Sequence, residues 1–154
     1  MTLEYYSMPG FLIRRLHQIS ISVFEDRTKS AGFDLTPVQY SALNALEEYP
    51  SIDQKTLAGL IAHDRVTIGG VVDRLVSKGY AVQSVNPQDR RSKAHNITPS
   101  GRKLLTAVRP YVLEAQEIML TGLTKQEKKT LMELMKKTVE EGNALSRAPL
   151  IEVD

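Results

Sequence analysis

The 154-residue sequence contains no cysteine and no tryptophan, and only 6% of its residues are aromatic. The lack of cysteine excludes disulfides and thiolate metal sites. No apolar run approaches the roughly 20 residues that a membrane-spanning helix needs, so we expect no membrane partner. The N-terminus, MTLEYYSMPGF, has no basic segment before an apolar stretch, so we expect no signal peptide and a cytoplasmic protein.

Motifs that carry catalysis are also missing from the sequence. It contains no HExxH pattern, no phosphate-binding loop and no supported Ser/His/Asp arrangement. The three histidines, His17, His63 and His95, are far apart in the sequence, which argues against a shared site. We therefore expect a protein that is not an enzyme and that uses no metal and no cofactor.

The charge is unevenly distributed along the chain. Hydrophobic residues make up 42% and charged residues 25%, which are ordinary values for a single globular domain over residues 1–154. The net charge of +2 divides into −2 for residues 1–50, +6 for residues 51–110 and −2 for residues 111–154. A basic centre favours contact with a polyanion, although solvated surface lysines would give the same excess.

Helical periodicity marks both ends of the chain. Leu12, Leu16, Ile19 and Val23 recur at spacings of three and four, which predicts a helix that ends near Gly32. Threonine–proline pairs at 36–37 and 98–99 are typical helix starts. Thr124 with Glu127 three residues later predicts the start of a last helix, and residues 146–154 are expected to be frayed.

The basic centre has a pattern that is typical of a DNA-binding motif. Asp53 and Asp64 are each predicted to cap a short helix, and the tight connection between these helices indicates a helix-turn-helix. Residues 81–85 and 94–97 are predicted to form strands, with turn chemistry at 86–89. The expected fold is mainly α, an α+β winged helix, with six helices, a helix-turn-helix and a β-hairpin wing.

The helices at both ends of the chain are additional to those that a compact winged helix needs. Their apolar faces need a partner, and a second copy of the chain is the simplest one; packing on their own domain is the alternative. We assign residues 1–33 and 104–146 to dimerisation helices and residues 36–101 to a winged helix-turn-helix lobe that binds DNA.

Fourteen residues are candidates for contact with double-stranded DNA. The second helix of the motif presents its N-terminal part to base edges, and neighbouring helix starts and the hairpin loop are placed to bind phosphate or the minor groove. The candidates are Gln39, Gln54, Lys55, Thr56, Arg65, Val66, Thr67, Gly69, Gly70, Arg74, Asp89, Arg90, Arg91 and Lys93.

Each of these assignments has an alternative. The glycine pair can approach DNA or simply pack on a helix, and Arg74 can bind phosphate or pair with Asp73 or Asp89. Asp89 is expected to orient Arg91 by a carboxylate–guanidinium pair, although the loop can also be a solvated charged turn. The upstream polar residues can simply be exposed to solvent.

The chain resembles the MarR family of bacterial transcriptional regulators. The resemblance is carried by Leu57-Ala58, by Asp73-Arg74-Leu75 with Lys78-Gly79-Tyr80, and above all by Asp89-Arg90-Arg91 followed by Ile97-Thr98-Pro99-Ser100-Gly101. It implies a winged-helix homodimer that binds a pseudo-palindromic operator, usually as a repressor. It also implies that Arg91 is the contact of the wing tip with the minor groove.

The resemblance further implies release of DNA by a small phenolic or aromatic acid or by cysteine oxidation, and the second route is excluded here. A pocket for an anionic effector needs a cation and a hydrogen-bond donor beside apolar walls. Arg14 and His17, on one face of the first helix, and Tyr111 are the candidates, although each can equally be a surface or core residue. The alternative function is a winged-helix regulator that has no small-molecule effector.

Overall fold

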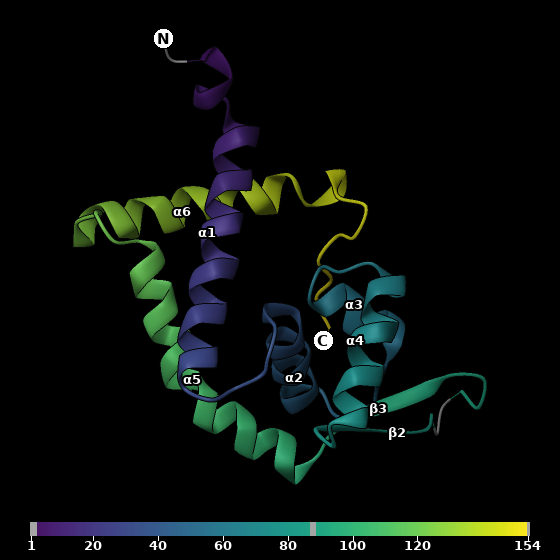
Figure 1. Ribbon diagram of the computed structural model, residues 1–154. Helices are drawn as coiled ribbons and strands as arrows, with labels where there is room; N and C mark the ends of the chain where they lie inside the picture. The colour runs from purple at the N-terminus through teal and green to yellow at the C-terminus, as the bar shows by residue number, and fades with distance from the viewer. Residues whose placement is uncertain (1–2, 87–88, 154) are drawn as a thin grey trace. The chain divides into compact units, whose positions relative to one another are not determined.

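The computed structural model describes residues 3–86 and 89–153. The six expected helices and the β-hairpin are confirmed (Figure 1). The described residues also form two short 3-10 helices and one further strand, which were not predicted. In chain order the elements are η1 (Glu4–Ser7), α1 (Pro9–Ser30), α2 (Pro37–Glu48), β1 (Ile52–Asp53), α3 (Gln54–Leu60), α4 (Arg65–Ser77), β2 (Ala81–Val85), β3 (Lys93–Ile97), α5 (Pro99–Met119), α6 (Lys125–Glu141) and η2 (Asn143–Leu145).

The chain divides into two compact units. One unit contains the residues up to Pro37 together with Val108–Leu123. The other, which we call the reading unit, contains Val38–Ala107 together with the residues from Thr124 onward. Within the described residues, every helix is too short or too polar to cross a membrane.

Both expected aspartate caps are present in the reading unit. The Asp53 carboxylate accepts hydrogen bonds from the backbone N–H groups of Lys55 (2.8 Å) and Thr56 (3.0 Å) and so begins α3. Asp64 begins α4 in the same way, accepting from the Thr67 N–H at 2.9 Å. Such bonds satisfy N–H groups that have no partner inside the helix, which is why an aspartate at each position sets a helix start.

A three-stranded antiparallel sheet supports the second helix of the motif. The strand order is β1-β3-β2, with Ile52 opposite His95 on one side of β3 and Ala81 opposite Ile97 on the other. Strand β1 is not predictable from the sequence because two residues are too few to show an alternating pattern. Residues 87–88 of the predicted turn at 86–89 lie outside the described residues.

The motif Ile97–Gly101 joins the end of α4 to the start of α5. The Thr98 hydroxyl donates a hydrogen bond to the Gly79 carbonyl at 2.6 Å and accepts one from the Gly101 N–H at 3.1 Å. The Thr98 N–H donates to the Tyr80 carbonyl at 3.0 Å. A Cβ at Gly101 would overlap that carbonyl oxygen and lie 2.8 Å from Cγ1 of Ile97, so only glycine fits.

The C-terminal tail is docked on the reading unit, so the expectation that it is frayed was wrong. The Asn143 side chain bonds both backbone groups of Leu150, at 2.9 and 2.8 Å. The Ile151 N–H donates to the Gly59 carbonyl at 3.1 Å, and a Cβ at Gly59 would lie 2.6 Å from Cδ1 of Ile151. The tail is held by backbone contacts with α3 that its own composition does not reveal.

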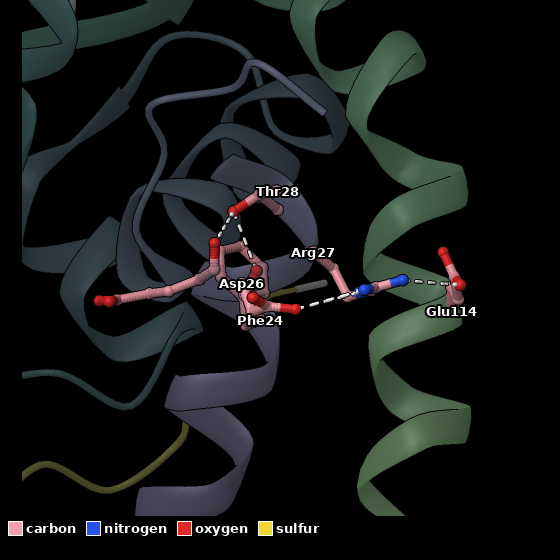
Figure 2. Close-up of polar contacts among 6 residues, drawn as sticks. Phe24, Asp26, Arg27, Thr28 and Glu114 are labelled. Carbon is pink, nitrogen blue, oxygen red and sulfur yellow. Dashed lines mark hydrogen bonds and ion pairs between the residues drawn. The ribbon is translucent and has the colours of Figure 1, made fainter. Parts of the chain in front are cut away.

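In the other unit, α1 is tied to the second half of α5. Arg27 places one guanidinium nitrogen 3.2 Å from a Glu114 oxygen and another 3.3 Å from Asp26 (Figure 2). One turn of α1 is closed by the buried Thr28 hydroxyl, which donates to the Phe24 carbonyl at 2.9 Å. These contacts fix the end of α1 before the chain enters α2.

Two helices leave apolar side chains uncovered in the single chain. Leu12 and Ile19, which lie on the predicted apolar face of α1, are 53% and 40% exposed. Helix α6, every residue of which the structure describes, has no buried residue, and Leu134 and Val139 on its apolar side are exposed. An amphipathic helix of this kind normally covers its apolar stripe.

Gly101→Ala is expected to lower the free energy of unfolding by about 1–3 kcal/mol, because the new methyl meets backbone that has no room to move. Urea denaturation followed by circular dichroism measures the loss. The control is Ser100→Ala at the exposed neighbouring position, where a change within about 0.5 kcal/mol is expected. Equal stability of the two variants would show that the junction is looser than described.

Candidate nucleic-acid interface

The first turn of α4 presents an exposed reading surface. Arg65, Val66 and Thr67 are all exposed, and the exposed fraction of Val66 reaches 89%. The Thr67 hydroxyl donates to the Asp64 carboxylate at 2.6 Å, and this bond, with that of the Thr67 N–H, lowers the pKa of Asp64. The Thr67 methyl group and oxygen lone pairs remain available to a base edge.

The glycine pair in α4 has two different environments. A Cβ at Gly69 would lie 3.1 Å from the Gln54 amide nitrogen, so Gly69 serves the close packing of α3 against α4. At Gly70 no atom of the described residues lies within 4 Å of an added Cβ. Packing within the protein therefore explains the first glycine but not the second, and Gly70 stays a candidate for close approach of a ligand.

The candidates near the start of α3 are only partly accessible. Lys55 is exposed, whereas the Thr56 hydroxyl donates to Asp53 at 2.9 Å and the Gln54 amide donates to the Arg65 carbonyl at 3.1 Å. Gln39 is only 4% exposed on α2, so the expectation that it reaches DNA is withdrawn. The burial of Gln39 depends on tertiary packing, which its position near a helix start does not reveal.

Asp89 shapes the described part of the wing loop, residues 89–92, in an unexpected way. Its carboxylate accepts the backbone N–H of Arg91 at 2.9 Å, which makes a short local turn. Among the described residues it makes no ion pair with the Arg91 guanidinium, so the predicted carboxylate–guanidinium pair is wrong. The guanidinium groups of Arg90 and Arg91 are exposed, and the Lys93 ammonium donates to the Gln83 amide oxygen at 3.1 Å.

The surface formed by α4 and the wing carries exposed cations that no acid among the described residues neutralises. Within the described ranges, Arg65, Arg90 and Arg91 take part in no ion pair. Arg74 pairs with neither Asp73 nor Asp89 there, which removes the structural alternative for this arginine. Unpaired cations on adjacent elements favour a polyanionic ligand.

The three candidate effector residues all lie in the unit formed by α1 and the second half of α5. Arg14 and His17 are exposed on α1; the Arg14 guanidinium donates to Gln18 at 3.2 Å and lies 5.1 Å from the centre of the Phe11 ring. Tyr111 packs on Phe33 with ring centres 5.7 Å apart. Within the described residues, no hydrogen bond or ring contact joins Tyr111 to the α1 pair.

His95 is not among the residues predicted to contact DNA, although it lies beside four of them. Its ring lines a small cavity together with Gln54, Lys55, Arg65 and Lys93. The only signal available in the sequence was its place in β3, where alternate residues face the same side of the sheet.

A family model described as MarR family matches residues 33–92. The HTH-type transcriptional regulator YybA of Bacillus subtilis is 31% identical over 126 residues, covering 82% of this chain and 80% of the relative. The chain belongs to the MarR family of transcriptional regulators. The exposed cations Arg65, Arg90 and Arg91 lie in α4 and in the loop between β2 and β3 of its winged helix.

Solved structures of MarR-family regulators share the fold of this chain. BpsR of Bordetella bronchiseptica, whose DNA binding is regulated by 6-hydroxynicotinic acid, matches with a TM-score of 0.83 and 25% identity, covering 91% of this chain and 99% of that one. The transcriptional repressor CouR, bound to a 23-mer DNA duplex, matches with a TM-score of 0.77 and 26% identity over the same shares.

Gly70→Ala is expected to stabilise the protein by up to about 1 kcal/mol, because alanine favours a helix and nothing obstructs its methyl group. We expect DNA binding to weaken at the same time, because the methyl separates the α4 backbone from the duplex. Thermal unfolding and fluorescence anisotropy measure the two effects.

The control for Gly70→Ala is Gly10→Ala in α1, where an added Cβ also meets nothing within 4 Å. This control is expected to leave the affinity for DNA unchanged. A Gly70→Ala variant with the affinity of the wild type would contradict a close approach at this position.

Proposed function

We propose that the protein is a ligand-responsive repressor that binds a pseudo-palindromic operator as a homodimer. In this proposal a small aromatic or phenolic acid releases the DNA. The observation that carries the proposal is the set of exposed cations in the first turn of α4 and the loop of the wing, Arg65, Arg90 and Arg91, which pair with no acid among the described residues. A helix in the major groove and a basic hairpin in the adjacent minor groove both use such cations.

The uncovered apolar residues of α1 and α6 support the dimer. A homodimer buries the same surface on both copies, so residues 1–33 and 104–146 would each cover the equivalent helices of the partner. Two winged-helix lobes, each formed by residues 36–101, would then face one duplex at a fixed spacing. Such an arrangement favours an operator with two related half-sites.

The effector is proposed from residue chemistry together with the likeness to BpsR. Arg14 supplies a cation for a carboxylate, His17 lies one turn further along α1, and Tyr111 offers an aromatic ring and a hydroxyl. 6-Hydroxynicotinic acid, which regulates BpsR, combines an aromatic ring with a carboxylate. An acid of this class could bind these groups and change the spacing of the two lobes.

Arg91→Ala is expected to weaken DNA binding and to make its salt dependence less steep, because the wing loses one cation that neutralises phosphate. The slope of log K against log salt should fall by about 1. The control is Lys125→Ala at the start of α6, which removes the same charge from an exposed position off the winged helix. Unchanged affinity and slope in Arg91→Ala would overturn the role of the wing.

The effector is tested with a panel of aromatic and phenolic carboxylates at millimolar concentration, including 6-hydroxynicotinic acid. At least one acid is expected to abolish DNA binding and to raise the melting temperature of the free protein. Arg14→Ala should lose this response but still bind DNA, whereas Arg15→Ala should keep both properties. If no acid on the panel has an effect, the regulator without an effector is the correct description.

A further inference from the structure

A small cavity lies where α3, α4 and the wing meet in the reading unit. Its volume is about 200 Å³, and a water molecule in the liquid occupies roughly 30 Å³, so a phosphate group fits. Three of its lining residues are cations, one from each element: Lys55, Arg65 and Lys93. The cavity is therefore an electropositive recess rather than an apolar one.

The carboxylate that lines the cavity, Asp53, is already occupied as the cap of α3. Burial alone would raise the pKa of Asp53, but the hydrogen bonds from Thr56 and Lys55 outweigh burial and lower it. Asp53 therefore stays ionised, with its oxygens turned to these donors. It offsets one of the three cations, so the cavity keeps an excess of positive charge.

His95 gives this recess its clearest sign of a binding role. The side chain is only 1% exposed, it lines the cavity, and neither ring nitrogen has a hydrogen-bond partner among the described residues. A buried polar group without a partner destabilises a protein, whereas an aliphatic residue at this place in β3 would leave nothing unsatisfied. The histidine is therefore better explained by something that binds it.

Burial, with a contribution from Lys93, lowers the pKa of His95 and favours the neutral ring. Asp53 at the start of α3 and Asp73 on α4 act in the opposite direction and do not cancel the shift. Lys55 and Arg65 on the cavity wall add further positive charge. A neutral imidazole has one N–H donor, which suits a phosphate oxygen, and one acceptor nitrogen.

We propose that this cavity binds a single phosphate group of the DNA backbone, with the His95 ring as hydrogen-bond donor and the three cations around the charge. The inference rests on the proposed function, because it requires that α4 and the wing enter adjacent grooves of a duplex. One sugar–phosphate strand separates a major groove from the next minor groove. That strand must pass between α4 and the wing, where the cavity lies.

A phosphate bound in this cavity, which we call the phosphate pocket, would position the duplex in a way that surface cations do not. A phosphate held between α4 and β3 fixes the register of the duplex relative to both reading elements, although it carries no sequence information of its own. Loss of the His95 donor should therefore weaken binding to all duplexes by a similar factor. It should leave the preference for particular base pairs unchanged.

The test uses a duplex that the wild-type protein selects from a randomised library. Each phosphate is replaced in turn by a neutral methylphosphonate, and affinities are measured for the wild type, His95→Leu and His95→Gln. Leucine removes the donor at similar volume, and glutamine restores an N–H donor. Lys93→Ala serves as a second variant, which removes a cation of the pocket but keeps the ring.

We expect one phosphate in each half-site to be coupled to residue 95. His95→Leu should bind the unmodified duplex about tenfold more weakly than the wild type. The loss of affinity that the methylphosphonate at this position causes should be smaller in His95→Leu than in the wild type, by a factor of about five. His95→Gln should regain part of both effects. Lys93→Ala should lower the salt slope by about 0.9, whereas His95→Leu should leave it unchanged because the ring is neutral.

A measurement on the wild-type protein keeps the proposal testable if a variant does not fold. In protein labelled with ¹⁵N-histidine, the duplex should shift the His95 ring signals, and the duplex with a methylphosphonate at the coupled position should not. Inorganic phosphate should cause the same shift only at millimolar concentration. A shift with inorganic phosphate but not with the duplex would assign the cavity to a free anion and overturn the proposal.

Absence of a shift with either ligand would mean that water satisfies the ring nitrogens, and it would also overturn the proposal. Failure of this inference is distinguishable from failure of the proposed function. If the protein selects no duplex, both are overturned. If it binds a duplex with the expected dependence on Arg91 but no phosphate is coupled to residue 95, only the phosphate pocket is wrong.

Discussion

The junction between α4 and α5 is the contact on which the reading unit depends. The Thr98 hydroxyl links the Gly79 carbonyl to the Gly101 N–H, and Gly101 lies against the backbone of Tyr80. Because β3 leads directly into Thr98, one short segment sets both the end of α4 and the base of the wing. The two elements can therefore keep a fixed spacing, which a pair of DNA grooves at fixed separation requires.

Three aspartates also order the backbone of α3, α4 and the wing. Asp64 holds the first turn of α4, Asp53 holds α3, and Asp89 shapes the loop of the wing through the Arg91 N–H. In each case a carboxylate orders the backbone, while the arginine side chains stay exposed. The protein thus arranges its backbone before binding, which reduces the entropy lost when the duplex is bound.

Local signals in the sequence predicted the local structure well. The caps Asp53 and Asp64 and the capping box of Thr124 follow from side chains that bond their own backbone, so a few neighbouring residues contain the whole cause. The burial of Gln39, the docked tail and the unpartnered ring of His95 depend instead on segments distant in sequence. The Asp89–Arg91 contact is local. Whether the Asp89 carboxylate accepts the backbone N–H or the guanidinium of Arg91 depends on the geometry of the turn.

The central claim is that α4 and the wing of each protomer read adjacent grooves of one duplex, in two half-sites related by a dyad. Hydroxyl-radical footprinting combined with methylation interference on the selected duplex tests it most directly. The account predicts two guanine-sensitive major-groove segments about one helical turn apart, each flanked on its outer side by a protected minor groove. The outer protection should be lost in Arg91→Ala. A single protected segment without dyad symmetry, or outer protection that persists in Arg91→Ala, would contradict the account.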